Sequence, residues 1–184
     1  MSNLKINEDI QIAGTEGSLG GMVGNLKYLE TRLNSYSLIT AKANGNQEGT
    51  VTFTASYGNE FTVPLDTKQN KMGNWLELDA DNNRIKVLRS GNVKVSGAFE
   101  GNFRGLLQLR IYRDGNNMIA IDQASDSTTS ARMISCLIPS YSFYCSAGSY
   151  IYFKVLAEYG GSYNYRGSRT WLTVEMPMEG QGVG

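Results

Sequence analysis

The chain has 184 residues, a formal net charge of zero and no histidine. Without histidine it has no Ser-His-Asp or Cys-His nucleophile system, no histidine general base and no histidine metal ligand. Balanced charge without a run of lysine or arginine leaves no electrostatic footprint for nucleic acid or an anionic membrane. We therefore expect no enzyme, no cofactor, no metal site and no nucleic-acid partner.

The length fits one domain with a short appendage. Glycine is abundant, with 21 residues, proline is scarce, with 3, and tyrosine occurs 11 times, which is typical of many strands joined by turns. No apolar stretch approaches the roughly 20 residues that cross a bilayer, and the N-terminus lacks a secretion signal. We expect synthesis in a cytoplasm and no membrane insertion.

The first residues, 1–37, differ from the rest and are predicted to be an attachment arm and a short helical neck. A glycine-rich break precedes a single helical candidate over Met22–Tyr36. Its apolar residues have coiled-coil seam spacing and are the predicted oligomerisation residues: Met22, Leu26, Leu29, Leu33 and Tyr36. Two heptads are too short to be stable alone. The helix therefore either packs against its own domain or forms a trimeric neck below a trimeric head.

Strand signals follow almost without interruption from residue 38 to 178, which is the predicted head, before a flexible tail over 179–184. The predicted strands are 38–43, 50–56, 60–65, 74–79, 84–89, 92–100, 106–113, 118–122, 132–138, 150–158 and 170–176. Short strands at this spacing indicate an all-β antiparallel sandwich or jelly roll.

The stretch Trp75–Gly101 has the clearest pattern. Apolar residues alternate with polar ones in three segments, and turn residues separate the segments at Asp79–Asn83 and Arg89–Asn92. We predict a three-stranded antiparallel meander. Asp79–Asn83 begins like a calcium loop, but Arg84 and Ser90 stand where that loop needs glycine and glutamate, so we expect a hairpin turn.

Two cysteines, Cys136 and Cys145, are close enough in sequence for a hairpin to pair them. The alternative is that both are free, buried apolar side chains, as reducing synthesis favours. Glycoside hydrolysis by two carboxylates remains open as chemistry. The candidate acids are Glu77, Asp79, Glu100, Glu158 and Glu175, and most lie in turns or on polar strand faces, where solvated charges are typical.

Aromatic residues crowd the C-terminal third. The segment Tyr159–Ser168 combines tyrosine with asparagine, serine and arginine between glycines, a composition suited to saccharide contact. The predicted ligand-binding residues are Tyr159, Tyr163, Asn164, Tyr165 and Arg166. The alternative is that these rings fill the sandwich core or a trimer axis.

Two segments resemble a known family. NRIKVLRSGNVKVSG (83–97) resembles the central hairpin of C1q/TNF-like jelly rolls, and SRTWLTVEMP (168–177) resembles their last strand. The version most similar to this chain occurs in tail, fibre and other virion proteins of bacteriophages. The resemblance implies a C1q/TNF-like jelly roll that forms a homotrimer.

On this basis we expect a non-enzymatic phage virion component of tail, fibre or baseplate type, located in the virion. Its predicted partners are a second and third copy, other virion proteins and a host-surface saccharide. Two alternatives stay open: a purely structural decoration or collar protein with no receptor, and a bacterial surface or spore-coat protein of the same fold.

Overall fold

The structure is a computed structural model that describes residues 36–43, 50–55, 58–115, 117–126, 130 and 132–177. Several predicted features lie outside these residues: the arm, the helical neck with Met22, Leu26, Leu29 and Leu33, and the tail at 179–184. Those predictions therefore stay predictions.

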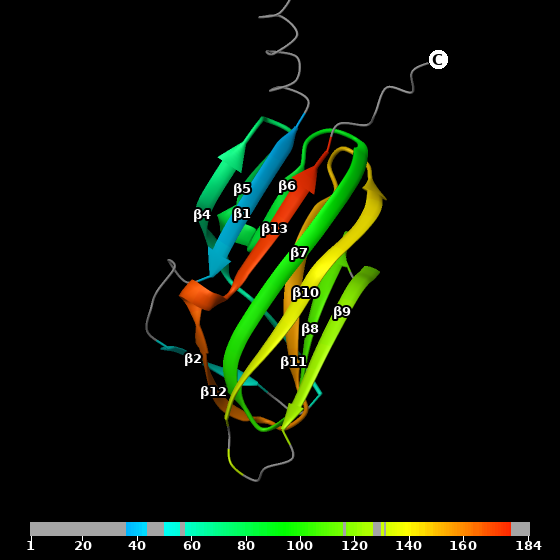
Figure 1. Ribbon diagram of the computed structural model, residues 1–184. Helices are drawn as coiled ribbons and strands as arrows, with labels where there is room; N and C mark the ends of the chain where they lie inside the picture. The colour runs from blue at the N-terminus through cyan, green and yellow to red at the C-terminus, as the bar shows by residue number, and fades with distance from the viewer. Residues whose placement is uncertain are drawn as a thin grey trace, which may run out of the picture.

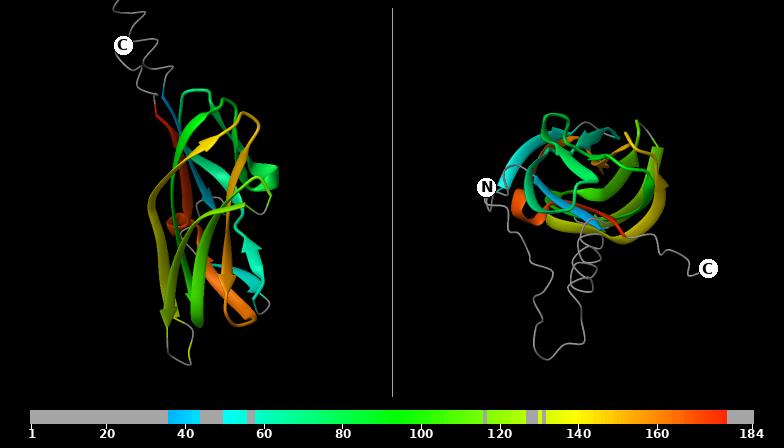
Figure 2. Two further views of the ribbon diagram at one scale, coloured as in Figure 1. Left: turned by 90° about the vertical axis from the view of Figure 1, so that its right-hand side faces the viewer. Right: turned by 90° about the horizontal axis from the view of Figure 1, so that it is seen from above.

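The described chain forms two antiparallel sheets that face each other across one core (Figures 1 and 2). The seven-stranded sheet has the order β2 (Thr50–Ala55), β12 (Gly161–Arg166), β7 (Gly91–Phe103), β13 (Trp171–Met176), β1 (Ser37–Ala43) and β4 (Leu65–Met72), and β10 (Arg132–Cys145) also pairs with β7. The six-stranded sheet has the order β5 (Leu76–Asp79), β6 (Arg84–Val87), β11 (Tyr150–Ala157), β8 (Gly105–Arg113) and β9 (Asn117–Asp126), and β3 (Glu60–Thr62) pairs with β11. This architecture confirms the predicted all-β antiparallel jelly roll.

The core follows from strict alternation along the strands. In β7, every second side chain from Gly91 to Phe103 is buried, including Val93, Val95 and Phe99, and β1, β11 and β13 alternate in the same way. Since successive strand side chains point to opposite faces, each strand contributes one apolar row to the space between the sheets. The inward positions expected in this stretch are confirmed.

The predicted three-stranded meander is wrong. β5 and β6 pair as a hairpin around the 3₁₀ turn η2 (Ala80–Asn82), with Asn83 in the left-handed conformation, but β7 belongs to the other sheet. At the crossing, the Leu88 amide donates to the Trp75 carbonyl at 2.7 Å. Alternation specifies which face of a strand is buried and says nothing about its neighbour, so a hairpin and a crossing have the same pattern.

Prolines mark two of the places where the predicted strand boundaries differ from the structure. Pro64 separates β3 from β4, a polar strand at the edge of its sheet that no apolar alternation predicts. The strand expected to end at Ile138 continues through Pro139 to Cys145, with a register shift between Ile138 and Tyr141. Because a bulge removes the need for a ladder hydrogen bond, it tolerates the missing proline N–H.

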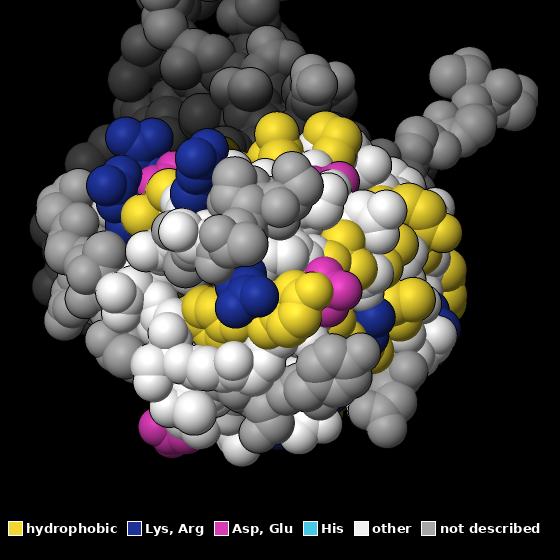
Figure 3. All heavy atoms as spheres, turned by 90° about the horizontal axis from the view of Figure 1, so that it is seen from below, with side chains coloured by type: hydrophobic (Ala, Val, Ile, Leu, Met, Phe, Trp, Pro, Cys, Tyr) yellow, Lys and Arg dark blue, Asp and Glu magenta, His cyan; other side chains and the backbone are white. Residues whose placement is uncertain are grey.

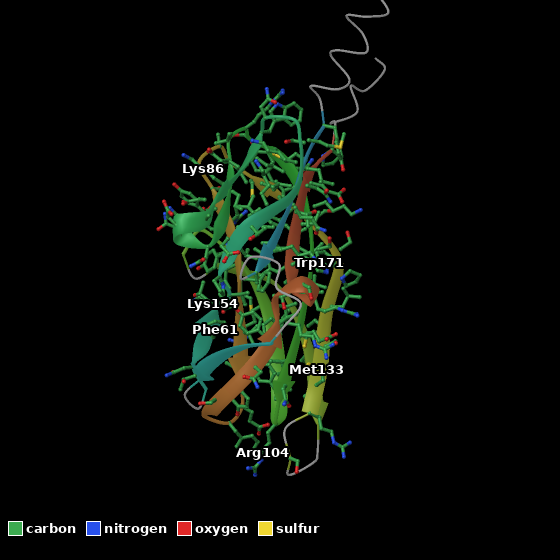
Figure 4. All side chains as sticks on the ribbon, turned by 90° about the vertical axis from the view of Figure 1, so that its left-hand side faces the viewer. Phe61, Lys86, Arg104, Met133, Lys154 and Trp171 are labelled. Carbon is green, nitrogen blue, oxygen red and sulfur yellow. The ribbon has the colours of Figure 1, made fainter. Side chains whose placement is uncertain are left out.

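The described chain starts and stops at the same end of the sandwich, since Ser37 lies opposite Met176 in the β1–β13 ladder. The turn between β7 and β8 and the turn between β11 and β12 lie at the other end, which we call the distal end (Figure 1). Arg104 is at this distal end (Figure 4).

Candidate functional site

The predicted ligand-binding loop is largely a strand. Gly161–Arg166 forms β12, which pairs with β2 along its length and with β7 at Asn164 and Tyr165. Tyr163 and Tyr165 are only 6% and 1% exposed. Their rings stack on Phe103 at 4.8 Å and on Phe99 at 5.5 Å between centroids, and burial raises the pKa of both hydroxyls. The ligand-binding prediction is therefore wrong for these two residues, and the core alternative is right.

The outward residues of the same strand face a different direction. Arg166 donates from Nη1 to Glu100 Oε1 at 3.0 Å, and Asn164 lies opposite Asn102 on β7. Both are on the outer face of the seven-stranded sheet, away from Tyr159 in the turn before the strand. The five predicted residues therefore do not converge on one site.

Tyr159 forms part of an exposed group at the distal end. The Arg104 guanidinium carbon lies 4.9 Å from the centroid of the Tyr159 ring, whose residue is 40% exposed. We call Arg104 and Tyr159 the distal pair. Seen from the distal end, a basic group lies on hydrophobic side chains near the middle of the surface, with an acidic side chain next to them (Figure 3). Tyr159 was predicted, whereas Arg104 was not linked to it, because they belong to turns between different strand pairs.

A close-fitting glycine and two hydrogen bonds hold Tyr159 and its neighbours in place. Gly105 has φ +75°, and a Cβ there would stand 2.4 Å from Tyr159 Cε2. The Tyr163 hydroxyl donates to the Tyr159 carbonyl at 2.5 Å, and Glu158 Oε2 accepts from the Leu106 amide at 2.8 Å. Glycine is therefore required beside the ring for both conformation and space.

A second surface is apolar and runs along β9 and β10. Of the nine large hydrophobic side chains that are exposed in the described part of the chain, six belong to these two strands, and we call them the apolar edge: Met118, Ile121, Met133, Leu137, Tyr141 and Tyr144. The two strands come from different sheets and are joined where the Leu137 amide donates to Asp122 Oδ2 at 2.7 Å. Hydrophobic side chains gather on the corresponding side of the molecule (Figure 3). A patch of this kind marks an interaction site.

The outer face of the seven-stranded sheet carries small side chains at its centre. Thr40 and Thr173 share a hydrogen bond of 2.9 Å, and Ser96 lies opposite Thr173. Ala98 lies between Trp171 and Leu137 in the ladder. Small side chains of this kind permit close approach by another surface.

Tyr36, the described member of the predicted seam, contacts its own domain. Its hydroxyl donates to the carboxylate of Glu175 on β13, and burial together with this carboxylate raises the pKa of Tyr36. Next to it, Ser37 Oγ donates to the Met72 carbonyl at 2.9 Å and accepts from the Trp75 amide at 3.2 Å. The start of β1 is thus fixed to the head.

The outer face of the six-stranded sheet carries a charged network. Glu60 on β3 accepts from Arg110 at 2.7 Å, from Lys154 at 3.0 Å and from the Tyr112 hydroxyl. Tyr112 stacks on Tyr152 at 5.7 Å. Burial acts to raise the pKa of Glu60, but the three donors outweigh it and lower the pKa below its ordinary value. The network ties the short strand β3 to β8 and β11.

Four of the five candidate acids, all but Glu77, each have a separate partner. Asp79 bonds to Arg84 at 2.7 Å and to Asn82 at 2.9 Å, so the Asp79–Asn83 segment is the expected hairpin turn. Arg84 and Asn82 also lower the pKa of Asp79. As given above, Glu100, Glu158 and Glu175 each have a separate partner. Within the described residues no group of three or more cysteines and acids is arranged to hold a metal.

Both cysteines are free and buried. Cys136 lies opposite Phe99 and Cys145 opposite Gly91 in the β7–β10 ladder, far apart along one strand. Burial raises the pKa of each thiol to about 11. The disulfide alternative is therefore wrong, and both side chains are core residues.

Comparison with known proteins locates the fold. No known protein family and no curated protein sequence matches the chain. Among solved structures, murine APRIL at pH 5.0 is similar with a TM-score of 0.59 and 12% identity over 77% of this chain and 98% of that one. Eiger TNF from S. frugiperda is similar with a TM-score of 0.60 and 12% identity over 82% of this chain and 98% of that one.

These likenesses define the fold class as a TNF-like jelly roll. At 12% identity they show the fold alone, so the expected place in a phage particle and the expected ligand stay predictions. In the described part of the chain, no helix is long and apolar enough to cross a membrane.

Proposed function

We propose that the chain is a non-enzymatic structural or receptor-binding component of a phage virion, and that its jelly-roll head assembles as a homotrimer. The observation that carries the trimer is the apolar edge. Six exposed hydrophobic side chains on two adjacent strands exceed the scattered apolar residues of an ordinary surface. They need a partner, and the same chain offers one.

The matching surface is the outer face of the seven-stranded sheet, with Ala98 and Trp171 near its centre. The apolar edge borders this face, since Leu137 lies opposite Ala98 in the β7–β10 ladder. The proposed contact is heterologous: the edge of one copy packs on the face of the next. Heterologous contacts form a closed ring when the rotation between copies closes on itself. In a closed ring of three copies, the apolar edge of every copy is buried against a neighbour. The sequence resemblance to C1q/TNF-like jelly rolls independently implies three copies.

The role in a virion is supported by the resemblance to phage jelly rolls and by the direction of the chain ends. Ser37, at the start of β1, lies opposite Met176, so the described head begins at the end opposite the distal end. An arm attached to the particle therefore presents the distal end outwards, where it meets a host-surface saccharide or a neighbouring virion protein. Once one copy of the trimer has bound, the other two sites see a high effective concentration of ligand. The trimer therefore binds a multivalent surface much more tightly than a single site does. A purely structural decoration protein has the same trimer without this contact.

The trimer is tested by the solution mass of the full chain in light scattering, with Leu137→Asp as the variant and Leu88→Asp as the matched control. Both leucines are exposed, at 53% and 41%, but Leu88 lies outside the apolar edge. We expect about three times 20.2 kDa for the wild type and for Leu88→Asp, and the monomer mass for Leu137→Asp. Circular dichroism checks that both variants fold.

A monomeric wild type, or a Leu137→Asp variant that keeps the wild-type mass, contradicts the proposal. The receptor role is tested separately, by competition between purified trimer and phage particles for host cells. Competition supports a receptor-binding head, and its absence favours the purely structural alternative.

A further inference from the structure

We propose that the distal pair binds a carboxylate-bearing saccharide, with the Arg104 guanidinium as the group that holds the carboxylate. This inference rests on the proposed glycan contact and names its site and its ligand class. It shares no residue with the apolar edge, so the two proposals are tested by different variants.

The charge of Arg104 is available. Three other arginines of the head pair with a carboxylate: Arg84 with Asp79, Arg110 with Glu60 and Arg166 with Glu100. No carboxylate in the described part of the chain pairs with Arg104, whose interaction is with the Tyr159 ring. A guanidinium presents a planar fork of donors that matches the two oxygens of a carboxylate.

Glu158, which adjoins Tyr159, makes no ion pair with Arg104 among the described residues. Its Oε2 accepts a hydrogen bond from the Leu106 amide at 2.8 Å, which ties this carboxylate oxygen to the β8 backbone.

The pair is also rigid, which lowers the entropy lost on binding. Gly105 fits tightly against the Tyr159 ring, and Tyr163, itself buried, holds the Tyr159 carbonyl. The cation over the ring therefore stands on a support fixed by the core. An unpaired surface arginine without this support would sample many rotamers.

The surroundings indicate a saccharide rather than a bare anion. The 40% exposed Tyr159 provides a ring edge and a hydroxyl. Gly160 and Gly161, which follow it, add no side chain that would block approach. Hydroxyl donors and acceptors beside a guanidinium suit a ligand that carries several hydroxyls and one carboxylate, such as a uronic acid.

The experiment measures binding to the full chain by NMR titration at low salt, where a single charge contact is least screened. The probes are methyl β-D-glucuronide, its neutral counterpart methyl β-D-glucoside, and acetate. The variant is Arg104→Ala, and the matched control is Arg89→Ala, because the Arg89 guanidinium lies 4.4 Å from the Trp75 centroid in the same kind of cation–ring contact.

We expect the glucuronide to bind more tightly than either the glucoside or acetate. Arg104→Ala should weaken glucuronide binding about ten- to hundredfold, the effect of losing charge-assisted hydrogen bonds, and Arg89→Ala should leave it unchanged. Arg104→Lys should recover part of the affinity, since lysine keeps the charge and loses the fork.

Three results overturn the inference: no binding of the glucuronide, equal binding of the glucoside or acetate, or equal binding by wild type and Arg104→Ala. Light scattering on the same samples separates the two proposals. A trimer that fails to bind the glucuronide rejects the distal site and leaves the trimeric head intact. A monomer that binds it rejects the trimer and supports the site.

Discussion

The burial of Tyr165 leads to a stability prediction that separates a core aromatic from a binding aromatic. Tyr165 is 1% exposed and is among the largest fully buried side chains. Its ring lies 5.5 Å from Phe99 and 6.1 Å from Phe61, between centroids. Tyr165→Ala therefore removes an aromatic side chain from a close-packed core and leaves a cavity.

The expected cost is about 3 to 5 kcal/mol of unfolding free energy, the range for replacing a buried aromatic with alanine. For a domain of this size each kcal/mol lowers Tm by about 2 to 4 °C, so the melting temperature should fall by about 6 to 20 °C. Tyr159→Ala is the matched control. It removes an exposed ring and one cation–ring contact, which should cost at most about 1 kcal/mol.

Urea denaturation followed by circular dichroism measures both variants against wild type. The slope of unfolding free energy with urea should stay constant, so that a lower midpoint reports lower stability. The reasoning is refuted if Tyr165→Ala loses less than about 1 kcal/mol, or if Tyr159→Ala destabilises the protein as much as Tyr165→Ala does.

Two further predictions concern titratable groups. Glu60→Gln should lower stability by about 1 to 2 kcal/mol at pH 7, because Arg110 and Lys154 lose their carboxylate partner. The folded pKa of Glu60 lies below its ordinary 4.5, so this stabilisation is present above that pH and is lost as the pH falls through the lower folded value; a wild type and variant with parallel stability–pH curves below pH 5 would contradict it. Cys136 and Cys145, with buried thiols of pKa about 11, should react with iodoacetamide at pH 8 only after unfolding; fast labelling of native protein would show that these strands open.

Alternation allowed the inward faces to be predicted from sequence, and it succeeded where apolar and polar residues alternate over many positions, as in β7. It failed where the missing information was non-local. Whether the chain after Val87 pairs back or crosses to the other sheet depends on β13 and β10, which flank β7 from distant parts of the chain. The alternation of apolar and polar residues within β7 does not depend on which strands pair with it, so it cannot predict those partners.

In the candidate site too, local features could be predicted from the sequence and contacts between distant segments could not. In Gly161–Arg166, alternation of tyrosine with polar residues is a strand pattern, but the flanking glycines favoured a loop. The exposed Tyr159 was predicted from its turn, and its contact with Arg104 depends on two turns meeting at one end of the sandwich. The apolar edge could not be predicted from the sequence either. Ile121 and Leu137 belong to separate strands, and only the folded structure brings β9 and β10 side by side.

The pairing of β1 with β13 sets the timing of biosynthesis. β1 lies between β4 and β13, so the first strand of the head lacks one neighbour until the last strand has been translated. A nascent chain stopped before Trp171 exposes unpaired edges on both β1 and β7, which are templates for aggregation. Formation of such long-range contacts is slow. The head should therefore fold after release from the ribosome, and premature termination should yield insoluble product rather than a smaller folded domain.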